Sequence, residues 1–307
     1  MILFFEQTLN GLQLGVMLFL LAAGLTLVFG IMGIINLAHG SLYMIGAMAS
    51  AVIAMRTGSF GLGLLAGLGA AGLGGMAIEL GVLRQLYARP HLDQVGATFG
   101  LILLVDGLAT MIVGRQPLFV AAPQALSGAV TLWPGLDYPV YRLVVIGVGL
   151  LVAVLLYLIV HQTRLGMLIR AGATHRETVR ALGVDIRLVY TLVFGLGALL
   201  AGLAGVIAGP LVAVQVGMGE QILIGTFVVV VIGGTGSIRG AFLGAMLVGL
   251  VDTLTRAFAP GLLKQVLPAS EADALAGGLS SIAVYLLMAM VLLVRPEGLL
   301  PAQGQTQ

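Results

Sequence analysis

The chain contains no cysteine, few charged residues and no long hydrophilic domain. Without cysteine it can form neither a disulfide framework nor a thiolate metal site. Only 8% of the 307 residues are charged, whereas soluble domains carry about 25%. The net charge of +2 is too small to indicate a nucleic-acid partner. These absences exclude a soluble globule and leave no room for a nucleotide-binding or receptor domain.

Apolar sequence fills the chain instead, with 60% hydrophobic residues, a mean hydropathy of +1.14 and 46 glycines. No charged residue lies between Glu6 and Arg56, and about 20 apolar residues suffice to cross a membrane. The first segment lacks the basic region of a cleaved signal peptide, so we expect it to be retained. Glycine-rich helices pack closely in lipid. The sequence therefore predicts one all-α, polytopic transmembrane bundle over residues 1–307.

Uncharged runs and turn residues predict about eight or nine membrane segments. Two of the runs, 221–232 and 240–256, are short and are separated by a glycine-rich string. They form either two tilted spans or a broken or re-entrant pair within 221–256. The predicted segments are 8–31, 37–55, 61–83, 96–114, 141–160, 188–212, 221–232, 240–256 and 279–294.

The positive charges predict an orientation, because cytoplasmic loops are enriched in Lys and Arg. If 161–187 is cytoplasmic, nine such residues lie inside and five outside. Nine crossings then place the N-terminus outside and the C-terminus in the cytoplasm. The inside set is Arg84, Arg89, Arg164, Arg170, Arg176, Arg180, Arg187, Arg239 and Arg295; the outside set is Arg56, Arg115, Arg142, Arg256 and Lys264.

The segment 161–187 is the one long polar stretch with helix-forming signals. Thr174 precedes Glu177 by three residues, the capping-box pattern that begins a helix. Gly183 is a natural helix stop. The segment therefore predicts a helix of about two turns between Thr174 and Gly183.

The predicted helix has an apolar ridge of Val179 and Leu182 and a charged face with Arg176 and Arg180. Because so short a helix is not stable alone in water, it must dock onto something. It folds either onto the protein's own inner surface or onto a soluble partner.

Polar groups also gather at a glycine-rich break between two apolar runs. Asn36, His39 and Ser41 lie close together there. Unwound backbone at membrane depth is tolerated where it lines a cavity or is buried in protein. The cluster is either part of a translocation pathway or a polar turn at the rim.

Three carboxylates lie in or near apolar runs, where ionisable groups are costly and often functional. Glu79 lies near a helix end, and Asp252 is four residues from Arg256, so a rim position or an ion pair explains these two. Asp106 has no such explanation and is a candidate for the pathway.

The string Gly-Gly-Thr235-Gly-Ser237 has no following Lys and no preceding strand, so it does not predict nucleotide binding. It indicates a break between helices, and Thr235 and Ser237 join the pathway candidates. The four histidines have no metal-ligand spacing. No catalytic signature is present, so we expect no enzymatic activity and no metal site in this chain.

Several of these motifs resemble one transporter family. Residues 24–41, 170–185 and 231–240, with the ending Arg-Pro-Glu-Gly-Leu from Arg295, are similar to the permeases of branched-chain amino acid ABC importers of the LivH type. The likeness extends over nearly the whole chain. One departure is Arg239, which stands where we expect a less charged residue, often proline.

The resemblance implies a permease subunit in a bacterial inner membrane, surrounded by lipid. Its implied partners are a second, LivM-like permease, two cytoplasmic ATPases that use ATP and Mg, and an extracytoplasmic substrate-binding protein. This chain would bind no cofactor itself. Within 161–187, the implied ATPase-coupling residues are Arg170, Thr174, Arg176, Glu177, Val179, Arg180, Leu182 and Gly183.

The implied substrate is a branched-chain or other neutral amino acid. Closely similar permeases carry urea or short amides. From a different class, a self-sufficient ion- or proton-coupled carrier that uses Asp106 is the alternative, and a membrane scaffold is a third. A carrier works without an ATPase, whereas an ABC subunit does not.

Overall fold

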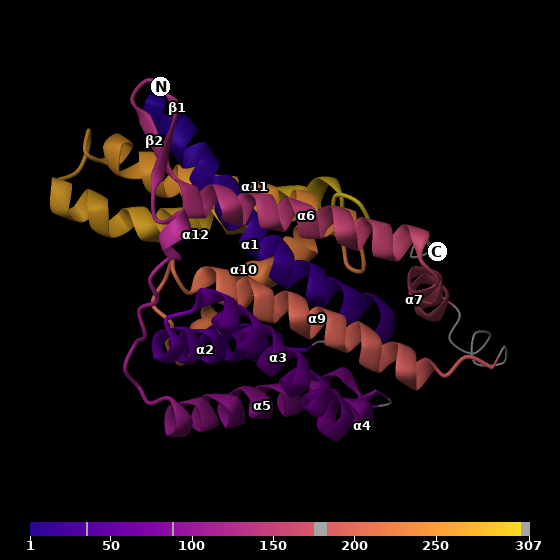
Figure 1. Ribbon diagram of the computed structural model, residues 1–307. Coiled ribbons are helices and arrows are strands. Elements are labelled where there is room, and N and C mark those ends of the chain that lie inside the picture. Colours follow the sequence, from indigo (N-terminus) through magenta and orange to yellow (C-terminus); the bar gives the residue numbers. More distant parts are fainter. Residues whose placement is uncertain (35, 88, 175–182, 302–307) are drawn as a thin grey trace.

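The computed structural model describes residues 1–34, 36–87, 89–174 and 183–301. Within them the chain forms a bundle of long helices with one small β-hairpin (Figure 1). Seven of the described helices are long and apolar enough to cross a membrane, and a shorter apolar helix joins them. The prediction of an all-α polytopic bundle is confirmed.

The helices are α1 (Ile2–Met32), α2 (His39–Thr57), α3 (Phe60–Ile78), α4 (Arg84–Leu86), α5 (His91–Ile112), α6 (Val140–Gln162), α7 (Arg164–Thr174), α9 (Ile186–Ala208), α10 (Met218–Gly233), α11 (Ile238–Leu263) and α12 (Ala269–Val294). A π-helix, η1 (Glu79–Leu83), joins α3 to α4, and a 3-10 turn, η2 (Gln124–Leu126), precedes the hairpin. Strands β1 (Ala129–Trp133) and β2 (Leu136–Pro139) pair antiparallel, with Val130 opposite Tyr138.

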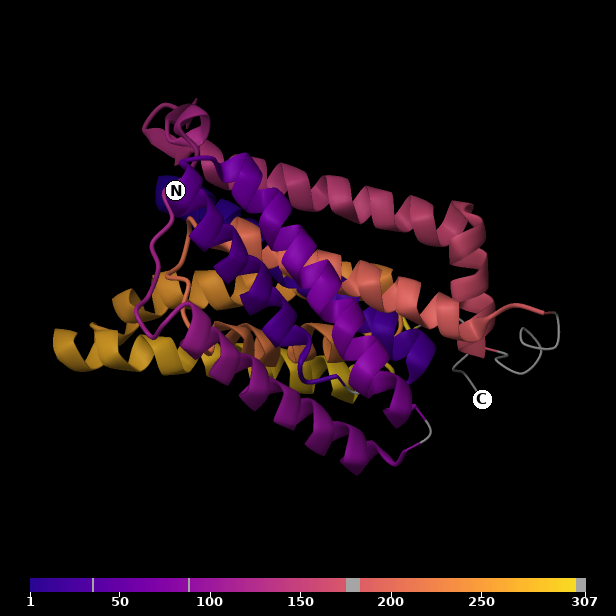
Figure 2. The same cartoon turned by 60° about the horizontal axis from the view of Figure 1, so that its bottom comes forward.

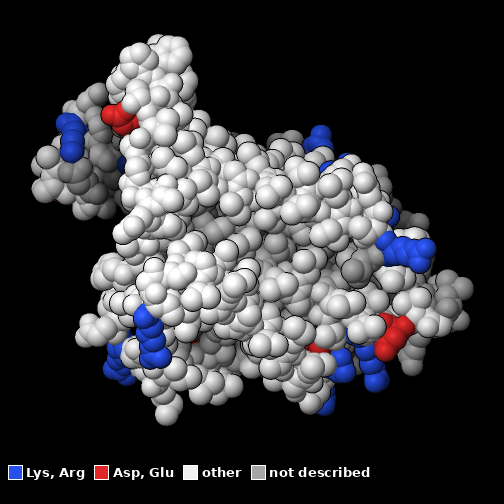
Figure 3. All heavy atoms as spheres, in the orientation of Figure 1, with Lys and Arg blue, Asp and Glu red and all other residues white. Residues whose placement is uncertain are grey.

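The bundle has two ends, which the N-terminus and α7 mark in Figures 1 and 2. At the amino-terminal end, Tyr138 of the hairpin donates a 3.0 Å hydrogen bond to Asn10 of α1. At the α7 end, the backbone of Leu299 bonds to the end of α10 at Ile232. Charged side chains lie toward both ends, and the middle of the face in Figure 3 is almost entirely uncharged.

Helices α1 and α9 form the core of the bundle. The most apolar windows of these helices are 83% and 72% buried, whereas that of α12 is 11% buried. Helices α5 and α6 are also largely exposed, and α5 stands apart from the bundle in both views (Figures 1 and 2). The exposed apolar faces of these outer helices suit lipid or another membrane helix.

Helix α2 begins inside the bundle rather than at its end. Its second residue, Gly40, packs against the start of α10, where a Cβ atom on Gly40 would lie 2.4 Å from the carbonyl oxygen of Gly219. A Cβ atom on Gly219 would lie 2.3 Å from the carbonyl oxygen of Gly40. The two helix starts therefore meet backbone to backbone, a distance that only glycine on both sides permits.

Each of the nine predicted apolar segments corresponds to a described helix, with bounds that differ by a few residues at most ends. The short pieces at 221–256 are α10 and α11, and they do not form a re-entrant hairpin. Helix α11 has 26 residues and reaches the amino-terminal end, where the ring of Phe258 lies 6.3 Å from that of Phe4. The second piece was predicted too short because Arg256 and Pro260 interrupt the apolar run.

The sequence did not predict the hairpin, α7, the short helix α4 or the turn η2. The segment 161–187 was expected to be a loop with one short helix that Thr174 begins. The structure adds α7 before that position: the Thr163 hydroxyl accepts a 3.1 Å hydrogen bond from the backbone of Gly166 and caps α7, which extends to Thr174. The helix predicted between Thr174 and Gly183 lies outside the described residues. The capping signal at Thr163 and the apolar spacing of Leu165, Leu168 and Ile169 could have predicted α7.

Because backbone at Gly219 occupies the space beside Gly40, we expect Gly40→Ala to destabilise the protein by about 1–3 kcal/mol. The thermal unfolding midpoint of the detergent-purified protein measures this loss. The control is Gly69→Ala in α3, where nothing lies within 4 Å of the added Cβ atom. Equal midpoints for the two variants would show that the α2–α10 contact does not constrain the fold.

Candidate functional site

The predicted polar cluster lies at the start of α2, fully buried. Asn36 accepts a 3.1 Å hydrogen bond at Oδ1 from the backbone of Ala38 and so shapes the turn into α2. The His39 ring lies between α1 and α9. A Cβ atom added to Gly24 of α1 would lie 2.9 Å from Nε2 of His39 and 2.8 Å from the carbonyl oxygen of Gly197 in α9. The ring is beside the Leu21 carbonyl, although no hydrogen bond between them has good geometry.

The Ser41 hydroxyl and the Asn36 amide nitrogen are buried without a hydrogen bond in the described part of the chain. Ser41 lies one residue beyond the contact between Gly40 and Gly219, so its backbone adjoins the first turn of α10. Buried polar atoms of this kind usually have a partner. Their clustering at two helix starts inside an apolar bundle marks this region as the candidate site.

Asp106 lies on the face of α5 that turns toward the bundle, together with buried Gln94 and Thr98. Glu220, in the first turn of α10, lies close enough for the charges of the two carboxyl groups to interact. One carboxylate oxygen of each residue is shielded from solvent without a hydrogen-bond partner among the described residues. Asp106 of α5 and Glu220 of α10 therefore lie within electrostatic range of each other, and Glu220 follows Gly219, which contacts the start of α2. Glu220 was not predicted as a site residue, although an acidic residue opening an apolar run was a visible signal.

Thr235 and Ser237 lie elsewhere, at the α7 end. The Ser237 hydroxyl accepts a 3.1 Å hydrogen bond from the backbone of Gly240 and caps α11. The break packs against the C-terminal segment, where a Cβ atom on Gly234 would lie 2.8 Å from the carbonyl oxygen of Glu297. The structure therefore does not bring these two residues together with Asn36, His39 and Ser41 at the start of α2.

Of the predicted coupling residues, the structure describes Arg170 and Thr174, which belong to α7, and Gly183, which precedes α9. Arg170 in α7 donates a hydrogen bond to the carbonyl of Val160 in α6. Gly183 has a φ of 84°, and two residues later Asp185 caps α9 through the backbone of Arg187 at 2.9 Å. Arg176, Glu177, Val179, Arg180 and Leu182, with the helix predicted there, lie outside the described residues.

Arg239, the residue that departs from the family pattern, has a structural place. Its guanidinium carbon lies 5.0 Å from the centre of the Tyr157 ring, and Nη2 is 3.2 Å from the Tyr157 hydroxyl and 3.4 Å from Nε2 of His161. Tyr157 and His161 stack with ring centres 4.4 Å apart. The arginine therefore ties the start of α11 to the end of α6.

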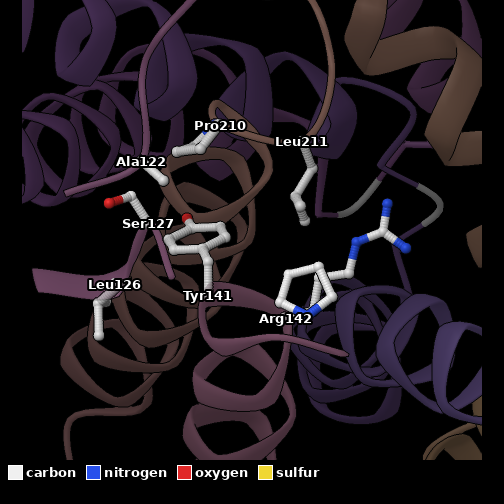
Figure 4. Close-up of a pocket in the computed structure, with 8 residues that line it drawn as sticks. Ala122, Leu126, Ser127, Tyr141, Arg142, Pro210 and Leu211 are labelled. Carbon is white, nitrogen blue, oxygen red and sulfur yellow. The ribbon is translucent and has the colours of Figure 1, made fainter. Parts of the chain in front are cut away.

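The amino-terminal end carries a hollow of about 240 Å³ (Figure 4). The Tyr141 hydroxyl, beside this hollow, donates a 2.8 Å hydrogen bond to the Ile207 carbonyl and fixes the start of α6 against α9. The hollow is lined by Ala122, Leu126, Ser127, Pro139, Tyr141, Arg142, Pro210 and Leu211. Within the described residues, no group of three or more His, Asp or Glu side chains could hold a metal ion.

Comparison with known proteins identifies the family. The family model described as "Branched-chain amino acid transport system / permease component" matches residues 7–294. The permease LivH of Escherichia coli is 27% identical and the permease BraD of Pseudomonas aeruginosa 30% identical, each over 97% of this chain and 95% of the relative. The ribose import permease RbsC of Escherichia coli is 27% identical over 76% of this chain and 72% of its own length. No solved structure matches the chain.

The chain belongs to the family of permease components of branched-chain amino acid transport systems. The resemblance to ABC importer permeases of the LivH type is thereby confirmed. The protein is a multi-pass membrane permease component, and a component of this kind is not itself catalytic.

Proposed function

We propose that this chain forms half of the translocation pathway of an ATP-driven importer that moves branched-chain or other neutral amino acids into the cytoplasm. The observation that carries the proposal is the family match, which extends from residue 7 to residue 294. LivH and BraD align over 95% of their length, whereas the ribose permease aligns over 72%. The fuller alignment favours an amino acid over a sugar as the substrate.

The partners follow from the same proposal. A second, LivM-like permease completes the pathway, two cytoplasmic ATPases hydrolyse ATP with Mg, and an extracytoplasmic binding protein delivers the substrate. The exposed apolar faces of α5 and α12 offer surface to the second permease or to lipid.

The α7 end faces the cytoplasm in this proposal, with the C-terminus inside and the N-terminus outside, in a bacterial inner membrane. The distribution of positive charge supports this orientation. Seven described arginines, Arg84, Arg89, Arg164, Arg170, Arg187, Arg239 and Arg295, belong to the α7 end, against Arg56, Arg115, Arg142, Arg256 and Lys264 at the other end.

The pathway runs beside the starts of α2 and α10. Asp106 and Glu220 supply negative charge there, which suits the ammonium group of an amino acid. The buried amide and hydroxyl of Asn36 and Ser41 stand nearby at a helix start, which suits the carboxylate. His39 supports this arrangement from the bundle core.

The orientation is tested with single cysteines, because the chain has none of its own. Ser127 and Gln162 are exposed residues on either side of the α6 span. We expect Ser127→Cys to react with an impermeant thiol reagent in intact spheroplasts and Gln162→Cys to react only after permeabilisation. The reverse pattern would invert the topology.

The energy source is tested at Asp106. If ATP drives transport, Asp106→Asn still supports ATP-dependent uptake in vesicles that contain the whole importer, because no proton needs to bind the carboxylate; the KM for the substrate rises, since Glu220 alone then supplies the negative charge. A pH gradient without ATP is expected to drive no uptake in either protein. Uptake driven by the gradient alone, and lost in Asp106→Asn, would support the proton-coupled carrier instead.

The coupling segment is tested at the predicted ridge. Leu182→Asp places a charge on an apolar contact, and Glu177→Arg adds like-charge repulsion of a few tenths of a kcal/mol per pair. We expect both variants to insert normally but to co-purify with less ATPase or to lose substrate-stimulated hydrolysis. Leu132→Asp in the exposed hairpin is the control and retains both. Normal attachment and uptake in both test variants would leave 161–187 without a coupling role.

A further inference from the structure

Glu79 is the one Asp, Glu, Lys or Arg residue among the described residues whose side chain is fully buried. A buried carboxylate costs several kcal/mol unless it is paired and hydrogen-bonded. Glu79 opens the π-helix η1, and π-turns of this kind often occur at functional sites.

The partners of Glu79 come from two separate parts of the chain. Arg84 lies 3.5 Å from Oε1 through Nε, and the Tyr87 hydroxyl donates a 2.5 Å hydrogen bond to the same oxygen. From α9, the Thr191 hydroxyl donates a 2.9 Å hydrogen bond to Oε2, and Arg84 donates one of 3.0 Å to Thr191. The carboxylate therefore joins the α3–α4 connection to the second turn of α9.

An aromatic contact strengthens the same junction. The rings of Tyr87 and Tyr190 meet edge to face, with centres 5.2 Å apart. Two consecutive residues of α9, Tyr190 and Thr191, thus contact Tyr87 and Glu79 in the connection between α3 and α5. A junction made by both a hydrogen bond and a ring contact leaves little freedom for the two segments to shift independently.

The junction continues to α5. The amide of Gln94, in the first turns of α5, donates hydrogen bonds of 3.3 Å to the Leu86 carbonyl and 3.1 Å to the Arg89 carbonyl. A series of contacts therefore connects α9 to α5. Thr191 bonds to Glu79, Glu79 bonds to Tyr87, and the neighbouring carbonyls of Leu86 and Arg89 bond to Gln94 of α5. Helix α5 carries Asp106, and only 22% of its most apolar window is buried, so most of its surface makes no contact within the described chain.

We propose that Glu79 is a positioning residue that transmits movement from the start of α9 to α5. This inference rests on the proposed function, in which ATPases act on the segment just before α9. When that segment moves, Thr191 carries Glu79 and the turn after α4 with it, and Gln94 passes the displacement to α5. Without the junction, hydrolysis proceeds but α5 does not follow.

The test uses the complete importer in vesicles and measures substrate molecules taken up per ATP hydrolysed. Thr191→Val removes the one hydroxyl that links α9 to Glu79 and keeps the side-chain shape. We expect it to lower this ratio about fivefold or more, the range of ordinary allosteric coupling, while hydrolysis continues. The control is Thr226→Val, whose hydroxyl bonds among the described residues only to the Ile222 carbonyl of α10, at 2.8 Å. It is expected to retain the wild-type ratio.

Glu79→Ala is expected to lower the ratio as Thr191→Val does. Glu79→Gln is expected to keep most of the wild-type ratio, because its side-chain carbonyl can still accept a hydrogen bond from Thr191 or Tyr87. Asp252→Asn breaks the ion pair with Arg256 and controls for the loss of a carboxylate. If Glu79→Ala does not assemble, Thr191→Val decides the outcome alone.

A second measurement separates transmission from general destabilisation. Spin labels at exposed Leu103 in α5 and exposed Leu286 in α12 report the distance between these helices with and without trapped ATP. Wild type and Thr226→Val are expected to show an ATP-dependent change that Thr191→Val lacks. A wild-type ratio and a wild-type distance change in Thr191→Val would overturn the inference. Absence of ATP-driven uptake in the wild type would instead overturn the proposed function.

Discussion

Close approach of helix backbones is the constraint on which this structure depends. Lipid is as apolar as leucine, so burying a hydrophobic side chain between helices gains little, and association relies on packing. The contact between Gly40 and Gly219 and the passage of α1 against α11 at Gly11 and Gly249 are of this kind. The contact between Gly40 and Gly219 holds α2 and α10 together at their first turns. It therefore also places the buried polar groups of the candidate site.

The sequence was sufficient to predict the fold class and the helices. Nine apolar segments were predicted, and all correspond to helices, because charges and prolines interrupt apolar runs near most helix ends. Arg256 and Pro260, which lie inside α11, are exceptions. The order of burial was not predictable. Helix α6 is more apolar than α1, yet α1 is central and α6 is peripheral. Hydropathy shows that a helix suits lipid, but it does not show which helix is surrounded by protein.

The candidate site was predictable only in part. Asn36, His39, Ser41 and Asp106 were singled out by their polarity in apolar surroundings, and the structure places them around the starts of α2 and α10 or facing them. Thr235 and Ser237 share that composition, but at the α7 end Ser237 caps a helix. From the sequence, Glu79 was interpreted as a rim residue. Its partner Thr191 lies 112 positions away, and local sequence patterns do not show contacts across that separation.

The length of helix α1 makes its position in the membrane depend on the thickness of the bilayer. Its 31 residues extend about 46 Å at 1.5 Å each, well beyond a hydrocarbon layer of about 30 Å. The first turn, with exposed Phe4 and Phe5, must therefore lie among the lipid headgroups or the helix must tilt. The nearby exposed Trp133 has the same preference for the headgroup layer. Bilayer thickness thus becomes a variable that sets the angle of the central helix, and through it the geometry of everything packed against it.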